Sequence, residues 1–241
     1  NEIYGNIKKF GNFTTGNFPS LKIADGRGQL YFETEANGTE EFVNLNFSLK
    51  EANKGRLIKN IIRAKEAGFF SKFKKEQREI GLEKDTFADE GSVTFAIQAE
   101  GPLNNPLQFE GTGTIHLRES KIGQINLLGK ISEGLSNLKI PLPSGAFSFN
   151  ELLIPFELNN ESIIFDNLNL SGPLSNIKAK GNFNLSNQTI DLIAKLSLVE
   201  NLPLPIIKNL LQLADPISKI AEIKMTGNYL DPKWELILSN D

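Results

Sequence analysis

Apolar and polar residues alternate strictly along much of this chain, and the apolar residues keep to one side. One run holds Ile177, Ala179, Gly181, Phe183 and Leu185, and the next holds Ile190, Leu192, Ala194, Leu196 and Leu198. Because successive side chains of a strand point to opposite faces, each run predicts a strand with one apolar and one polar side. The chain is therefore predicted to be mainly β, with a mostly antiparallel sheet that has one apolar face.

The same alternation predicts strands in other parts of the chain, namely residues 13–50, 93–99, 109–117, 147–198 and 234–238. Within residues 13–50, Asn37-Gly38 lies between two alternating runs. We expect a hairpin there, because both central positions of a type I′ turn need positive φ. Gly26-Arg27-Gly28 is also interpreted as a turn between strands rather than as a phosphate-binding loop.

A turn motif recurs between predicted strands. Residues 101–106 and 227–232 both read Gly-x-x-x-[Asn/Asp]-Pro, and residues 172–176 keep the first half of this motif. The spacings are irregular, which excludes a solenoid of fixed period. We interpret the motif as one hairpin connection used repeatedly within a long sheet.

Two segments change to a helical period. Residues 51–82 place an apolar stripe, which includes Leu57, Ile58 and Ile61, against many Lys and Arg residues, and Gly68 is expected to bend this helix. A basic amphipathic helix can bind an anionic membrane or a partner. Interrupting Glu residues favour a helix packed on the sheet instead. Residues 203–221 predict a second amphipathic helix, which Pro216 breaks or restarts.

Composition excludes several classes of protein. The 241 residues are 39% hydrophobic, with a net charge of −3 and no cysteine. There is no basic field for nucleic acid, no apolar stretch that could span a bilayer, and no thiol for a disulfide or a metal. The first ten residues do not resemble a signal peptide, so any targeting segment is expected to lie upstream. We expect residues 1–90 and 91–241 to be two regions or one continuous domain.

The predicted strands do not bring residues suited to catalysis together in one place. The polar sides or ends of strands hold Asp166, Asp191 and Glu157. General acid–base catalysis needs carboxylates in a partly dry pocket, and these positions do not provide one. His116, the one histidine, falls on a polar side and has no second metal ligand or triad partner in the pattern. We therefore expect no enzyme activity, no cofactor and no metal.

The apolar face contains small residues at Ala99, Ala179, Ala194, Gly111, Gly113 and Gly181. A sheet with glycines on its inner face can curl and leave a groove that suits acyl chains. The candidate groove residues are Val93, Phe95, Ile97, Phe109, Gly111, Gly113, Ile115, Phe183, Leu185, Ile190, Leu192, Leu196, Leu198 and Trp234. The alternative is a closed core with these glycines at barrel corners, and the pattern alone favours that alternative.

Residues 91–241 contain five sequence elements in a characteristic order. They are Gly111-Thr-Gly-Thr-Ile-His-Leu117 with the 122–138 stretch, then Phe149-Asn-Glu-Leu152 with Phe156-Glu-Leu158, then 164–173 ending in Leu-Ser-Gly-Pro, then 181–185 with 189–192, and finally Gly227 to Trp234 with its Asp-Pro-Lys-Trp. In this order and spacing the region resembles the C-terminal region of AsmA-like proteins, a bacterial envelope family that includes TamB-type relatives.

This resemblance implies a groove-forming sheet related to bridge-like lipid-transfer proteins. It implies a periplasmic location, anchorage to a membrane by a segment outside this sequence, and a role in outer-membrane lipid homeostasis or envelope biogenesis. The implied partners are a phospholipid or another acyl-chain lipid, with an envelope protein as a further partner and no nucleic acid. We therefore predict a long, curved sheet that forms a groove or partly open barrel, with two amphipathic helices packed on it. The alternative function is a structural or adhesion β-sandwich with a filled core.

Overall fold

The computed structural model describes residues 2–38, 40–66, 91–118, 149–173, 175–198, 222–229 and 231–237. The strands are β1 (Ile3–Phe10), β2 (Phe13–Ile23), β3 (Gly26–Asn37), β4 (Glu40–Asn53), β5 (Ser92–Pro102), β6 (Glu110–Arg118), β7 (Glu151–Asn159), β8 (Ser162–Ser171), β9 (Ser175–Asn184), β10 (Thr189–Leu198), β11 (Glu222–Asn228) and β12 (Lys233–Ile237). The helices are α1 (Lys54–Glu66) and the 3₁₀ turn η2 (Pro106–Gln108).

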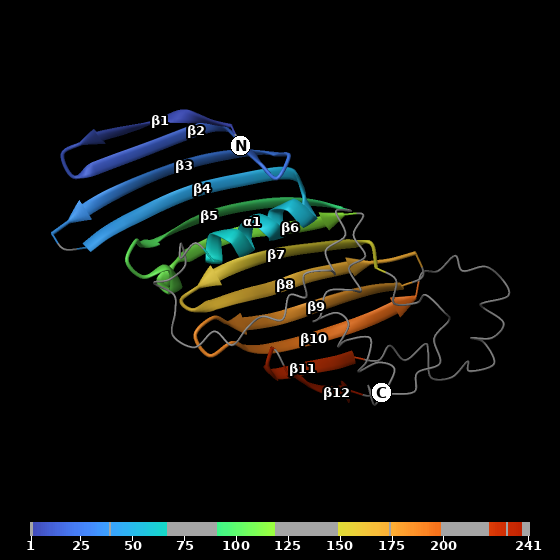
Figure 1. Ribbon diagram of the computed structural model, residues 1–241. Helices are drawn as coiled ribbons and strands as arrows, with labels where there is room; N and C mark the ends of the chain where they lie inside the picture. Colours follow the sequence, from blue (N-terminus) through green and yellow to red (C-terminus); the bar gives the residue numbers. More distant parts are fainter. Residues whose placement is uncertain are drawn as a thin grey trace, which may run out of the picture.

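All twelve strands belong to one antiparallel sheet, and their order in space is their order in the chain (Figure 1). Each strand pairs with the next, so β1 and β12 are the two edges of the described sheet. The prediction of a mainly β protein with a long antiparallel sheet is confirmed. The sheet is open, because its edge strands are not paired with each other. The alternative of a closed barrel is therefore wrong for the described strands.

The register places rows of mostly like side chains across the sheet, and Ile164 is the aliphatic exception in the polar row. One row runs through Asn6, Asn17, Tyr31, Asn46, Gln98, Thr112, Glu157, Ile164, Asn182, Asp191, Thr226 and Lys233. The neighbouring row runs through Ile7, Gly16, Phe32, Leu45, Ala99, Gly111, Leu158, Ile163, Phe183, Ile190 and Gly227. Directly paired residues share a face, so the alternation predicted for single strands becomes one polar and one apolar face of the entire sheet.

Tight turns keep this register. Ala24 and Asp25 between β2 and β3, and Asn160 and Glu161 between β7 and β8, all have positive φ, as two-residue type I′ hairpins require. The predicted hairpin between β3 and β4 is confirmed, but Asn37 still pairs with Glu40. The turn is therefore displaced by one residue.

The interpretation of residues 26–28 as a turn is wrong, because they form the start of β3. Gly26 is needed there for a different reason. A side chain at Gly26 would lie 2.6 Å from the backbone of Ala52 in β4, so the glycine permits close approach of the two segments. Both recurrences of the Gly-x-x-x-[Asn/Asp]-Pro motif connect consecutive strands, β5 to β6 and β11 to β12, as expected.

Helix α1 follows directly from β4. The side chain of Asn53 accepts a hydrogen bond of 2.8 Å from the backbone N–H of Arg56, which is an N-cap interaction. Leu57 packs on the apolar face, in a cluster with Leu49 and Phe95, and this confirms the prediction of a helix packed on the sheet. Ile61, predicted to be in the packed stripe, is 52% exposed. Residues 67–82 and the predicted helix at 203–221 lie outside the described residues.

The buried apolar residues form clusters within the single sheet. One cluster joins Leu152, Leu170 and Ile177 of β7, β8 and β9 with Phe149, and another joins Ile190 and Leu192 of β10 with Met225 of β11. These contacts connect neighbouring strands of one layer. Among the described residues, no second sheet packs on the apolar face, so a β-sandwich is not observed there.

Candidate functional site

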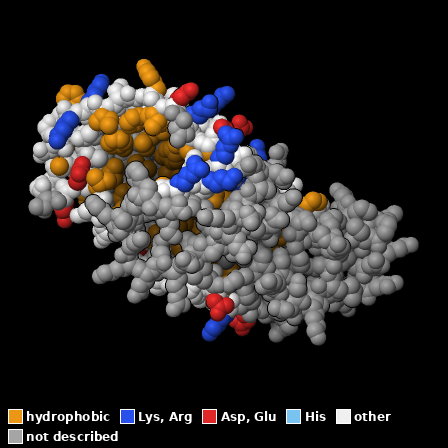
Figure 2. Space-filling model, viewed as in Figure 1, with side chains coloured by type: hydrophobic (Ala, Val, Ile, Leu, Met, Phe, Trp, Pro, Cys, Tyr) orange, Lys and Arg blue, Asp and Glu red, His pale blue; other side chains and the backbone are white. Residues whose placement is uncertain are grey.

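The candidate site is the apolar face, which we call the groove. Figure 2 shows it hollowed over the N-terminal strands, with hydrophobic side chains gathered in the hollow and Lys and Arg side chains beside it at α1. Phe47, Phe95 and Ile97 lie half-buried in this part of the face, whereas Val43 and Leu49 are buried. The described groove extends along the apolar row from β1 to β11.

Aromatic rings lie over two glycines of the groove floor, Gly16 and Gly113. A Cβ at Gly16 would lie less than 3.0 Å from three atoms of the Phe32 ring on the neighbouring strand. At Gly113 the obstacles would be the ring of Phe156 and, at 2.6 Å, the carbonyl oxygen of Ala96. Gly16 and Gly113 therefore do not open empty pockets in the floor. They give rings on the adjacent strand a place to lie flat.

These rings also contact one another. The centroids of Phe18 and Phe32 are 6.4 Å apart, those of Phe47 and Phe95 are 5.9 Å apart, and those of Phe95 and Phe156 are 6.3 Å apart. All three pairs have distances typical of favourable aromatic contacts. The floor of the groove therefore contains packed pairs of aromatic rings.

The predicted groove residues form two separate groups. The first comprises Val93, Phe95 and Ile97 of β5 with Gly111, Gly113 and Ile115 of β6, and the pairs Phe95–Ile115 and Ile97–Gly113 join the two strands. The second comprises Phe183 of β9 with Ile190 and Leu192 of β10. Strands β7 and β8 lie between the groups, so one groove contains both only because those strands continue the apolar face.

The remaining predicted groove residues have peripheral or undescribed positions. Phe109 precedes β6 and lies against Gly101, and Leu185 follows β9 in a turn, where its N–H donates to the Glu161 carbonyl at 2.6 Å. The backbones of Leu196 and Trp234 pair with Ile177 and Met225. The side chains of Leu196, Leu198 and Trp234 lie outside the described residues.

Sequence reasoning missed the contribution of the N-terminal strands to the groove. The additional groove residues are Leu21, Leu30, Phe32, Val43, Leu45, Phe47 and Leu49. Their alternation predicts strands, but the small residues from which the groove is predicted, and the resemblance that agrees with it, both lie within residues 91–241. One signal in the sequence could have found them. If each strand is assumed to pair with the next strand in the chain, the apolar residues at every second position of the N-terminal strands lie on the same face as those of the later strands.

The polar face carries one charged cluster near its middle. Nε2 of His116 is 2.7 Å from Oε1 of Glu151, and Nε of Arg118 is 3.5 Å from the same oxygen. The hydrogen bond with His116 is the main reason why the pKa of Glu151 is lowered. His116 is thus less isolated than expected. Within the described ranges no group of acidic residues and histidine has a metal-binding arrangement.

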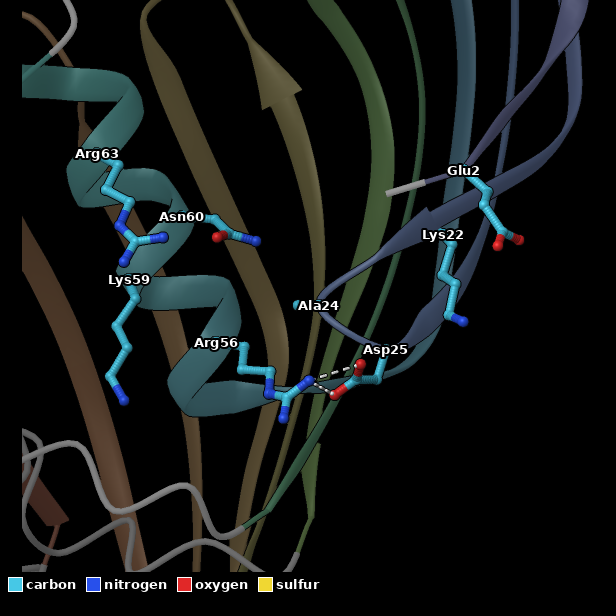
Figure 3. Close-up of a pocket in the computed structure, with 8 residues that line it drawn as sticks. All are labelled: Glu2, Lys22, Ala24, Asp25, Arg56, Lys59, Asn60 and Arg63. Atoms are coloured by element: carbon cyan, nitrogen blue, oxygen red, sulfur yellow. Dashed lines mark hydrogen bonds and ion pairs between the residues drawn. The ribbon is translucent and has the colours of Figure 1, made fainter.

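Two cavities at opposite ends of the strands differ in charge. One, of about 550 Å³, lies between α1 and the β2–β3 turn and is lined by Glu2, Lys22, Ala24, Asp25, Arg56, Lys59, Asn60 and Arg63 (Figure 3). The other, of about 650 Å³, lies where β5 turns into β6, and its charged lining residues are Glu40, Glu100 and Glu110. The first is predominantly cationic and the second is acidic.

Comparisons with family models, with curated proteins and with solved structures found no match for this chain. None of the helices in the described part of the chain has the length and apolar character needed to cross a membrane.

Proposed function

We propose that this chain is a non-enzymatic lipid-binding and lipid-transfer protein, which holds acyl chains on the apolar face of its open sheet. The observation that carries the proposal is the uninterrupted row of apolar residues and glycines that crosses eleven consecutive strands, from Ile7 to Gly227. A face of this extent supports binding of an oily partner, because such binding is driven by the apolar area that it removes from water and scales with that area.

The dimensions of the row suit a lipid. Neighbouring strands are about 4.8 Å apart, so ten successive pairings extend over roughly 50 Å. The hydrocarbon core of a bilayer is about 30 Å thick and contains two acyl chains end to end. An apolar row of this length is therefore long enough for acyl chains that lie along it. Each CH₂ group removed from water contributes about 0.8 kcal/mol to binding.

The proposed setting is the bacterial envelope. The resemblance of residues 91–241 to AsmA-like proteins supports a periplasmic location, anchorage to a membrane by a segment outside this sequence, and a role in outer-membrane lipid homeostasis or envelope biogenesis. The absence of cysteine from all 241 residues is compatible with this setting. An envelope protein partner belongs to the same proposal.

The alternative function is a structural or assembly scaffold. Contacts such as that between Phe95 and Phe156 favour it, because they fill the floor without any ligand. A scaffold needs no bound lipid, whereas a transfer protein must accept and release one. The two functions therefore differ in a direct measurement.

Organic extraction of the purified protein followed by mass spectrometry tests the proposal. We expect bound phospholipid, and transfer of a fluorescent phospholipid between vesicles. Ile97→Asp introduces a carboxylate into the half-buried groove, where a charge next to hydrocarbon costs several kcal/mol, so lipid loading should fall at least tenfold. Gln98→Asp is the matched control, because it adds the same charge to the polar face of the same strand.

Circular dichroism must show both variants folded. Equal loading of the two variants, or the absence of extractable and transferable lipid from the wild-type protein, would contradict the proposal and favour the scaffold.

A further inference from the structure

Helix α1 presents a row of polar and cationic side chains to one cavity. Arg56, Lys59, Asn60 and Arg63 follow the spacing i, i+3, i+4, i+7, which places them on one face of a helix. Figure 3 shows these side chains on α1 across the cavity from Lys22 and Asp25 of the β2–β3 segment. From sequence, binding of an anionic membrane or a partner is only the alternative for these basic residues, because the sequence does not show what faces them.

One backbone contact and one side-chain contact hold α1 beside the β2–β3 turn. The N–H of Asn53, immediately before the helix, donates to the carbonyl oxygen of Ala24 at 2.7 Å. Nη1 of Arg56 lies 2.7 and 2.8 Å from the two carboxylate oxygens of Asp25. The cavity therefore has a defined wall on each side, although both charged partners are more than half exposed.

The charge of the cavity is positive. Four of its lining side chains are cationic, namely Lys22, Arg56, Lys59 and Arg63, and two are carboxylates, Glu2 and Asp25. Asp25 already accepts from Arg56. An anion that entered the cavity would meet a lining of net positive charge in a volume of about 550 Å³, which is sufficient for a phosphate group and its water.

The cavity also borders the groove. Ala24 lines the cavity and, at the same time, belongs to the buried apolar cluster with Leu49 and Ala52. Leu57, one residue after Arg56 on α1, packs on that cluster. Figure 2 shows the same arrangement from outside, with Lys and Arg side chains at the border of the hydrophobic hollow.

We propose that this cavity binds the phosphate of an anionic lipid whose acyl chains lie in the groove. The inference rests on the proposed function and adds to it the class of headgroup and the place where it binds. Guanidinium groups bind phosphate through two parallel N–H donors, and lysine adds a point charge. Arg56 would share its donors between Asp25 and the phosphate, while Lys59 and Arg63 bind the phosphate directly.

Short-chain lipids below their micellar concentration test this site by calorimetry. The probes are dihexanoyl phosphatidic acid, uncharged dihexanoylglycerol and inorganic phosphate. We expect phosphatidic acid to bind at least tenfold more tightly than either of the other two, since it alone uses both the cavity and the groove. Its affinity should fall as salt is raised.

Variants distinguish binding in this cavity from a non-specific effect of the protein's positive charges. In the double variant Lys59→Gln/Arg63→Gln we expect the affinity for phosphatidic acid to fall about tenfold or more, to that of the uncharged lipid, with the uncharged lipid unaffected. The control Lys178→Gln/Lys180→Gln removes two exposed cations from the polar face of β9 and should change neither affinity. Asp25→Asn should raise the affinity for phosphatidic acid, because it releases Arg56.

The possible failures are distinct. If no lipid binds, the proposed function fails. If both lipids bind equally and the cavity variant changes nothing, the headgroup site is overturned and the groove stands. If inorganic phosphate binds as tightly as phosphatidic acid, the site takes free phosphate, and the assignment to a lipid headgroup is overturned.

Discussion

The pairing of Gly16 with Phe32 predicts opposite effects of Gly16→Ala on stability in two proteins. The change should destabilise the wild-type protein and stabilise a Phe32→Ala variant. Gly16 is buried in β2, and its φ lies outside the left-handed region, so alanine meets no backbone strain there. The three atoms nearest to an added Cβ all belong to the Phe32 ring, at less than 3.0 Å. The ring is therefore the main obstacle to a methyl group at this position.

The magnitudes follow from this contact. In the wild-type protein, Gly16→Ala must displace the ring from the groove floor and from Phe18, which should lower the free energy of unfolding by about 1–3 kcal/mol. In a Phe32→Ala background the methyl group occupies vacated space. Alanine then gains the backbone-entropy advantage over glycine within a strand, about 0.5–1 kcal/mol. The coupling between the two changes should be about 2 kcal/mol or more.

Urea denaturation followed by far-UV circular dichroism on the four proteins of this cycle measures the coupling. Gly38→Ala is the control, because nothing lies within 4 Å of its added Cβ and its φ of 67° makes alanine cost about 1 kcal/mol through strain alone. That cost should be the same with and without Phe32. If Gly16→Ala costs the same in both backgrounds, within about 0.5 kcal/mol, the ring does not lie over the glycine and the description of the floor is wrong.

Three further predictions concern other parts of the sheet. Gly181→Ala should destabilise the protein more than Gly16→Ala in the same urea assay, because its Cβ would collide with the backbone carbonyl of Asp191, which cannot rotate away; an equal or smaller loss would contradict this. The lowered pKa of Glu151 means that its bond with His116 stabilises the fold fully above the usual pKa of a glutamate, and that this contribution is lost as pH falls through the lowered pKa. Since Glu151 is exposed, Glu151→Gln should cost less than about 1 kcal/mol at neutral pH and nothing at low pH, and a pH-independent cost would refute the assignment. Ile7, 61% exposed on edge strand β1, should promote self-association, so Ile7→Lys should reduce concentration-dependent sedimentation, and unchanged sedimentation would show that this edge is not the contact.

The sequence was sufficient for the strands because one-sided burial imposes a period of two on every strand. It was not sufficient for features that depend on register. Whether Gly16 lies opposite Phe32 depends on the length of the β2–β3 hairpin, and the displaced β3–β4 turn shows that such lengths can be wrong by one residue. A displacement of one residue within a pairing would put Tyr31 or Glu33 opposite the glycine instead.

The two candidate sites, the groove and the cationic cavity, also differ in how far the sequence could predict them. The apolar face could be predicted from alternation in each strand, without knowledge of the neighbours. The cationic row of α1 could be predicted as a helix face, but not as the wall of a cavity. That wall exists because Asn53 bonds to Ala24, a contact between residues 29 positions apart that no local pattern encodes.

The chemistry of the two sites implies a division of roles in lipid recognition. The aromatic floor offers dispersion and hydrophobic contact, which are non-directional and scale with buried area, so it can distinguish acyl chains by length but hardly by headgroup. Directional, charge-assisted bonds are available in the described groove region where α1 meets the β2–β3 turn. If the proposed function is correct, selection among lipids should therefore depend on Lys59 and Arg63, whereas capacity should depend on how many strands carry the apolar row.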